Sequence, residues 1–421
     1  MLKKLFQTTV TRALSAFLGL VILSINARYI GSEGVGEVAL FNLWVSIFLM
    51  LSNLPGGSAM VYYAVRYKSS ELLATAYIWA VIALVLPMAV LWIFPTLLPS
   101  PVFLLIVLFF YSTGWAHQYL LVGIEKLHLH NAASLAVNST LIGALVYQYS
   151  VFTPKAEHYY LALSLGAGAQ WLLSLVFLWP RLRLEGFDFK INVQLIKQLL
   201  INGFHIQIGN LVQQLNYRFT YFFLEKYQGT GTVGIFAAVV QLGEGIWLLA
   251  KSVSLVVYSR VSQNGSDFSA GVLTFVTARW VAVLSGLAIL LLAMLPDGVY
   301  HRFLGPQYMG LGHWMLLMTP AVAILAAGMI YSHFLAGKGL FFINFLISLL
   351  AFIPIVLLGD LLTSRLGLYG AVLLNTCSYS ITAVGSFLIV LRHVDSESKV
   401  YMFRFINDIK ILHQQLKKGQ D

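Results

Sequence analysis

The sequence has few charged residues and almost no cysteine. Only 10% of its 421 residues are charged and 59% are hydrophobic, whereas soluble domains carry about 25% charged residues. The single cysteine, Cys377, excludes an internal disulfide and with it a disulfide-stabilised secreted domain. One water-soluble core cannot hide this much apolar surface. Soluble enzymes and disordered chains are therefore excluded, and a mean hydropathy of +0.81 predicts a polytopic membrane protein.

Motifs for several chemistries are also missing from the sequence. There is no G-x-x-x-x-G-K-[ST] phosphate loop, so we expect no direct use of ATP. His128 and His130 lie two residues apart and would face different sides of a helix, which argues against a metal site. We expect no cofactor, no metal and no catalytic residue, and predict that the chain is not an enzyme. No basic soluble module is present, so nucleic acid is not an expected partner.

Long apolar stretches dominate what is present. A membrane-spanning helix needs about 20 mostly apolar residues, while barrel strands would be about 10 residues long and alternating. Twelve stretches fit helices, with approximate bounds 10–30, 36–63, 72–94, 102–123, 131–152, 158–179, 198–223, 232–257, 272–295, 311–335, 339–359 and 367–391. The first resembles a signal peptide, but no clean cleavage site follows, so we expect an uncleaved helix. An all-α fold of about twelve transmembrane helices is predicted.

The distribution of Lys and Arg predicts the orientation. With the N-terminus in the cytoplasm, 19 of the 26 basic residues fall on the cytoplasmic side and five on the outer side, among them Arg28 and Lys155. Both termini are therefore expected in the cytoplasm. The last segment, 394–421, has apolar residues at helical spacing and several lysines, which predicts an amphipathic helix on the cytoplasmic leaflet. A frayed tail is the alternative.

The two halves of the chain resemble each other. Residues 35–51 (VGEVALFNLWVSIFLML) correspond to 233–249 (VGIFAAVVQLGEGIWLL), and N-A-R at 26–28 corresponds to N-Y-R at 216–218, an offset near 198 residues. An even number of spans separates the copies, so the repeat is parallel rather than inverted. We predict two six-helix lobes, 1–190 and 191–393. Chance similarity between apolar helices is the alternative.

At these motifs the sequence resembles the multidrug/oligosaccharidyl-lipid/polysaccharide exporter superfamily, and within it the Wzx-like polysaccharide flippases. The segment 216–253 carries the clearest match, with a polar seventh helix, a Gly-rich turn and a Glu in the eighth helix. The resemblance covers nearly the whole chain and implies a MATE-like fold. The family often has an acidic residue two positions after the arginine, where this sequence has Thr220. That departure puts ion coupling at this position in doubt.

Polar residues inside the predicted spans mark the candidate site. Gln207, Asn210, Gln214 and Arg218 share one face of the seventh span, and a lipid-facing helix could not tolerate such a row. They predict a solvated cavity, with hydrogen bonding between helices as the alternative.

Charged and polar residues on other spans add to this candidate site. The eighth span contributes Glu244, a candidate for coupling, and Lys251, which are two turns apart, so each needs a partner from elsewhere. In the other lobe, Arg28 and Asn42 are candidates; Arg28 and Lys251 could instead extend to the membrane surface.

Arg28, Arg218 and Lys251 outnumber Glu244 and predict a cationic cavity suited to phosphate oxygens. With the resemblance, this predicts a flippase that moves an undecaprenyl-diphosphate-linked oligosaccharide, such as an O-antigen unit for lipopolysaccharide, across the bacterial inner membrane by alternating access. The expected partners are this substrate, membrane lipids, a polysaccharide polymerase and a chain-length regulator. A MATE-type drug or metabolite antiporter and a lipid II flippase are the alternatives. A membrane enzyme is disfavoured by the short outer loops.

Overall fold

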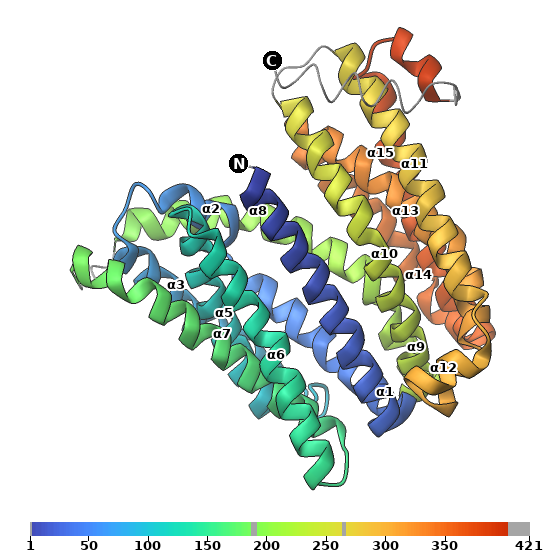
Figure 1. The fold of residues 1–421 in the computed structure, drawn as a ribbon, viewed down its shortest axis with the longest axis horizontal. Helices are drawn as coiled ribbons and strands as arrows, with labels where there is room; N and C mark the ends of the chain where they lie inside the picture. Colours follow the sequence, from blue (N-terminus) through green and yellow to red (C-terminus); the bar gives the residue numbers. More distant parts are fainter. Residues whose placement is uncertain (1, 187–191, 263–266, 403–421) are drawn as a thin grey trace. The chain divides into compact units, whose positions relative to one another are not determined.

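The computed structural model describes residues 2–186, 192–262 and 267–402, and it contains no strand in these ranges. Helices account for nearly all of them (Figure 1). In chain order the elements are α1 (Leu2–Ser52), α2 (Gly57–Tyr63), α3 (Ser69–Ala83), α4 (Val85–Ile93), α5 (Pro101–Gly123), α6 (Leu127–Val151), α7 (Ala156–Glu185), α8 (Val193–Arg218), α9 (Thr220–Gln228), α10 (Thr230–Ser262), α11 (Asp267–Ala293), α12 (Asp297–Leu304), the 3₁₀ turn η1 (Pro306–Tyr308), α13 (Leu311–Gly337), α14 (Phe341–Leu366), α15 (Leu368–Arg392) and the 3₁₀ turn η2 (Glu397–Met402).

The predicted number of membrane spans is confirmed. Ten helical segments of the described chain are long and apolar enough to cross a membrane. One of them, Val10–Ser52, holds the first two predicted spans, because Gly31 has a left-handed φ of 66° and interrupts α1. The seventh predicted span is the polar helix α8, which is not among the ten because its composition is not apolar enough. The fold is thus all-α with about twelve transmembrane helices.

Two breaks shape the N-terminal helices. The second predicted span is interrupted at residues 53–56, where α1 ends at Ser52 and α2 begins after Pro55 and Gly56. The third is divided at Leu84, three residues before Pro87, because proline lacks the backbone N–H of a continuous helix. Pro320 and Pro354, in contrast, lie inside continuous helices.

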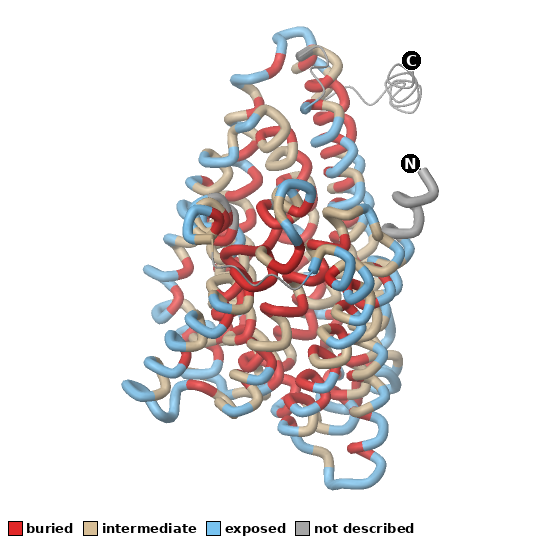
Figure 2. Tube along the Cα trace, turned by 90° about the vertical axis from the view of Figure 1, so that its left-hand side faces the viewer, coloured by how far each residue is buried: buried red, intermediate tan, exposed pale blue. Residues whose placement is uncertain are grey.

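The chain forms two compact units. Unit 1 consists of residues 1–214, 229–237 and 303–307, and unit 2 of 215–228, 238–302 and 308–421. In unit 1, α7 packs against α5 and α6, and α6 packs against α1. In unit 2, α13 and α15 pack against each other, α11 packs against α13, and α14 against α15. Buried and exposed residues follow each other along most helices, as expected when one face of a helix packs inside its bundle (Figure 2).

The predicted lobe boundary at residue 190 lies outside the described residues, so the lobes 1–190 and 191–393 stay predictions. The predicted amphipathic tail also lies mostly outside them. Its first part, residues 394–402, is described and ends in η2. Arg279 in α11 donates from Nη1 to the carbonyl oxygens of Tyr401 and Met402, at 3.0 Å each. These bonds hold the start of the tail against α11.

The two copies of the repeat touch each other in unit 1. A Cβ atom on Gly36 would lie 1.9 Å from the carbonyl oxygen of Thr230, and one on Gly234 would lie 1.9 Å from that of Ser32. Gly36 and Gly234 are equivalent positions of the repeat, as are Ser32 and Thr230. The contact is therefore reciprocal, as in a two-fold symmetric interface. Only glycine allows the two backbones to approach this closely.

Candidate functional site

The polar row on α8 is hydrogen-bonded to neighbouring groups in unit 1. Gln207 is buried, and its Nε2 donates to the carbonyl oxygen of Asn53 at 3.2 Å, within the break between α1 and α2. Asn210 donates from Nδ2 to Oε1 of Gln207 at 3.2 Å, and Gln214 donates to Oγ of Ser46 at 3.4 Å. These bonds fit the alternative of hydrogen bonding between helices. A cavity-lining role for the three amides stays a prediction.

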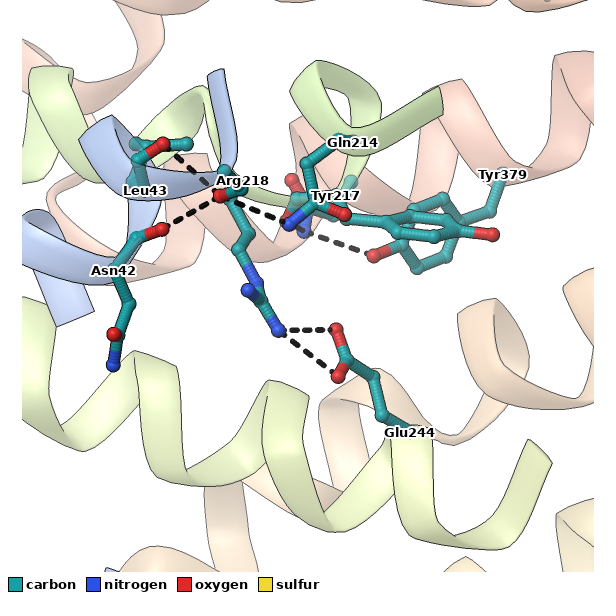
Figure 3. Close-up of polar contacts among 9 residues, drawn as sticks. Asn42, Leu43, Gln214, Tyr217, Arg218, Glu244 and Tyr379 are labelled. Carbon is teal, nitrogen blue, oxygen red and sulfur yellow. Dashed lines mark hydrogen bonds and ion pairs between the residues drawn. The ribbon is translucent and has the colours of Figure 1, made fainter. Parts of the chain in front are cut away.

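The most distinct feature of the candidate site is an ion pair in unit 2. Arg218, the last residue of α8, donates from Nη2 to both carboxylate oxygens of Glu244 in α10, at 2.9 and 3.0 Å (Figure 3). The side chains are 23% and 26% exposed. A charge at membrane depth is costly unless it is paired or solvated, and each residue offsets the charge of the other. Arg218 is thus the partner from another helix that Glu244 was expected to need.

Three aromatic rings pack beside this pair. The ring centroids of Tyr217 and Trp247 lie 5.6 Å apart, those of Tyr217 and Tyr379 lie 5.7 Å apart, and those of Trp247 and Tyr379 lie 5.6 Å apart. Trp247 donates from Nε1 to the carbonyl oxygen of Val322 at 3.0 Å. Trp247 and Tyr379 are fully buried. Because Tyr217 precedes Arg218 and Trp247 lies one turn after Glu244, the rings restrict the positions from which both charged side chains extend.

Four neutral polar side chains, two of them close to Arg218 in sequence, form hydrogen bonds in unit 2. The sequence alone did not reveal them. Thr220 donates to Oδ1 of Asn375 at 3.2 Å, and Asn375 donates to the carbonyl oxygen of Tyr217 at 3.3 Å. Ser378 donates to Oδ1 of Asn216 at 3.1 Å. All but Tyr217 are buried. Thr220, two positions after Arg218, thus has its hydroxyl engaged in a hydrogen bond. A detectable signal was the spacing of Asn375 and Ser378 on one helix face.

The remaining candidates lie in different surroundings. Asn42 donates from Nδ2 to the hydroxyl of Tyr159 at 2.9 Å, inside unit 1. Lys251 is exposed on α10, in unit 2. Arg28 lines a cavity of about 580 Å³ in unit 1.

The charges around the predicted cations are more balanced than the sequence indicated. Arg28 shares its cavity with Lys155, but the same cavity is lined by the carboxylates of Glu33, Glu37 and Glu157. Arg218 is paired with Glu244. Glu33 and Glu157 lie outside the predicted spans, and Glu37, near the start of the predicted span 36–63, was not included among the candidate charges. Among the described residues no group of three or more His, Cys, Asp or Glu side chains could hold a metal ion.

Comparison with known proteins identifies the family and the fold of this chain. The family model described as "Polysaccharide biosynthesis protein" matches residues 1–264. Among curated proteins nothing matches.

Three solved structures are similar over nearly the whole chain. The lipid II flippase MurJ in an inward closed conformation has a TM-score of 0.71 at 14% identity, covering 97% of this chain and 90% of its own. An inward-facing multidrug resistance MATE transporter of the MOP superfamily has 0.69 at 16%, covering 91% and 94%. The MATE multidrug transporter DinF-BH has 0.63 at 14%, covering 96% of each chain.

The chain belongs to the polysaccharide biosynthesis protein family and has the fold of the MOP superfamily, which MATE transporters and MurJ share. The resemblance seen in the sequence is confirmed at this level.

Proposed function

We propose that this protein is a flippase for an isoprenoid-diphosphate-linked oligosaccharide, moving it from the cytoplasmic to the outer leaflet. The substrate has three parts with different needs: an apolar lipid chain, a diphosphate and a polar sugar chain. The lipid chain can remain in bilayer hydrocarbon while the polar head crosses through the protein. The protein then lowers the barrier for the head group without making or breaking a covalent bond.

The observation that carries this proposal is the pair of Arg218 and Glu244. Both contacts to the carboxylate come from one guanidinium nitrogen, Nη2. Guanidinium presents five donors in a fixed plane that suits phosphate oxygens, so a diphosphate can replace the carboxylate as the partner of Arg218. In the absence of substrate, Glu244 offsets the charge of Arg218. Arg218 is then paired with an anion in both states, with Glu244 before the substrate binds and with the diphosphate afterwards.

Glu244 has a role in coupling in this proposal. When the diphosphate engages Arg218, Glu244 loses its counter-charge in surroundings where its side chain is only 26% exposed. Leaving one charge of such a pair unpaired is costly. Glu244 is therefore proposed to take part in coupling, as the group that loses its partner when the substrate binds. We expect transport to depend on the proton gradient and to lose that dependence in Glu244→Gln.

The amides of α8 and Asn42 are proposed to serve the sugar part. Gln207, Asn210, Gln214 and Asn42 hold donors and acceptors that can exchange their present partners for hydroxyl groups. Lys251 is proposed to attract the anionic head group before Arg218 binds it. An undecaprenyl carrier, an O-antigen repeat unit for lipopolysaccharide, a bacterial inner membrane, cytoplasmic termini and cooperation with a polymerase and a chain-length regulator belong to the same proposal.

This function is tested by deleting the gene in the host cell. Loss of a flippase should leave the lipid-linked oligosaccharide accumulated on the cytoplasmic leaflet and the surface polysaccharide absent. A drug antiporter would instead change susceptibility to cationic compounds while surface polysaccharide stays normal. The lipid II alternative predicts accumulation of lipid II and cell lysis. Glycosyltransferase and polymerase genes beside the gene would favour the oligosaccharide.

A further inference from the structure

The cavity that Arg28 lines is built around the break in α1. Gly31 has a φ of 66°, and the space beside its Cα is filled by the amide of Gln307, which accepts a hydrogen bond from the backbone N–H of Ser32. Ser24 donates to the carbonyl oxygen of Phe303. Residues 303–307 therefore hold the interrupted helix in place from both sides of the break. The cavity is thus shaped by contacts within the fold itself.

The charged side chains that line this cavity are a mixture of donors and acceptors. Arg28 and Lys155 supply N–H donors, and Glu33, Glu37 and Glu157 supply carboxylate acceptors. All five residues are exposed. In residues 2–186, 192–262 and 267–402, none of the five side chains has an ion pair or a hydrogen bond with a side chain of another described residue. They are available to a ligand.

Two of these carboxylates repel each other along one helix. Glu33 and Glu37 lie four residues apart, and like charges at this spacing destabilise a helix. Glu157 at the start of α7 brings a third carboxylate to the same cavity. Three carboxylates gathered in one cavity, none of them in an ion pair with another described residue, favour a binding role over a packing role.

An aromatic ring lies at the same cavity. Tyr29 is 56% exposed, and its ring lies 5.3 Å from that of Tyr149 at an interplanar angle of 30°. Tyr149 is buried and donates from its hydroxyl to Oδ1 of Asn26 at 2.9 Å. The buried ring fixes the exposed one, which offers an apolar surface to the C–H face of a sugar ring.

We propose that this cavity is a saccharide-binding subsite, which takes the hydroxyl groups of the oligosaccharide and not its diphosphate. Sugar hydroxyls both donate and accept, so they match carboxylates beside Arg28 and Lys155. Three carboxylates against two basic groups disfavour an anion such as a phosphate. A cavity of about 580 Å³ lies within the 300–1,000 Å³ of small-molecule sites. The subsite rests on the proposed function and specifies where the sugar binds: in the predicted orientation the cavity opens toward the outer side, where the head group arrives.

The test measures binding of a sugar without its lipid. Mild acid releases the host's oligosaccharide from its lipid-linked pool, and calorimetry measures its affinity for the purified full-length protein in nanodiscs. We expect binding to wild type, and a loss of about tenfold or more in Glu37→Gln and Glu157→Gln, since hydrogen bonds to charged groups contribute about 1.5–3 kcal/mol. Tyr29→Ala should weaken binding by about threefold to tenfold. Glu225→Gln, the same change at an exposed residue of α9 outside the cavity, should bind as wild type does.

Two results would overturn the subsite. One is that the released oligosaccharide fails to bind wild type, or binds the cavity variants and Glu225→Gln equally. The other is that inorganic pyrophosphate binds instead and loses affinity in Arg28→Gln, which would make the cavity an anion site. Translocation of the intact lipid-linked substrate is measured separately. Transport without sugar binding at the cavity refutes the subsite and leaves the flippase, whereas sugar binding without transport refutes the flippase.

Discussion

Gly36 and Gly234 lie backbone to backbone, although 198 positions separate them in the sequence. Each would place a Cβ atom 1.9 Å from a carbonyl oxygen of the other segment, Thr230 for Gly36 and Ser32 for Gly234. The offset that relates the glycines also relates the two carbonyl groups. The contact shows that the two copies of the repeat meet at the same residues, in the way expected of a parallel repeat.

The first prediction follows from this contact. Gly36→Ala and Gly234→Ala should each lower the thermal unfolding temperature of the purified protein, because the backbones must separate to admit a methyl group. Overpacking costs about 1–3 kcal/mol. Gly245→Ala, on the same helix as Gly234, has open space beside its Cα and should not lower the unfolding temperature. Equal behaviour of Gly234→Ala and Gly245→Ala would contradict the close approach.

The ion pair of Arg218 and Glu244 predicts that losing one charge destabilises the protein more than losing both. Glu244→Ala leaves a half-buried guanidinium unpaired and should destabilise unit 2 by about 1–3 kcal/mol, less than the 3–5 kcal/mol of fully buried pairs. Arg218→Met with Glu244→Ala removes both charges and should recover most of that stability. A thermal-shift double-mutant cycle measures the coupling. Additive effects of the two changes would show that the residues do not interact.

The neutral cluster around Thr220 predicts a change in stability without a change in transport. Thr220→Val keeps the shape of the side chain and removes the hydroxyl that donates to Asn375. The unpaired Asn375 oxygen should cost about 1–3 kcal/mol, while translocation per folded molecule stays as in wild type. In the control Thr376→Val, the lost hydroxyl bonds only to the carbonyl oxygen of Val372 in its own helix. Loss of transport in Thr220→Val alone would restore a coupling role to this position.

A buried histidine in unit 1 gives a prediction independent of the substrate. His117 is fully buried and bonds to the hydroxyl of Tyr77 at 2.9 Å and to Oγ of Ser174 at 3.0 Å, while Trp171 donates to Tyr77 at 2.8 Å. Ser174 donates its hydroxyl hydrogen to the carbonyl oxygen of Gln170 at 2.7 Å, so its Oγ accepts from the Nδ1–H of His117. Nε2 of His117 then accepts from the hydroxyl of Tyr77. His117→Gln should lower thermal stability by about 1–3 kcal/mol.

The exposed His128 provides the matched control for this histidine. His128→Gln should leave the unfolding temperature unchanged, because no buried partner depends on its ring. An effect of the same size in both variants would mean that the network around His117 adds no stability.

Hydropathy predicted the spans, because each needs only a local run of apolar residues. The break at Gly31 divides α1 between the first two predicted stretches, and even α8 was recognised despite its polarity, since its row of amides repeats on one face. The partner of Glu244 could not be predicted in the same way. Arg218 lies on another helix, and only the fold of unit 2 brings the two side chains together.

The surroundings of Arg28 were the least predictable part. Its cavity combines the break in α1 with residues 154–157 and 306–307, which are remote in sequence. Spacing along one helix cannot show that Glu157 faces the same space as Glu37. The charge of a cavity depends on all the segments that line it. Glu33 and Glu157 lie outside the predicted spans, where hydropathy carries little information.

Reconstituted vesicles give the most direct test of the account. The host's lipid-linked oligosaccharide, labelled on its sugar, is placed in vesicles, and its transfer between leaflets is followed with and without the protein. We expect wild type to accelerate the transfer, and Arg218→Ala to reduce the rate by about tenfold or more at normal insertion and abundance. A wild-type rate equal to that of empty vesicles, or full activity in Arg218→Ala, would contradict diphosphate capture at Arg218.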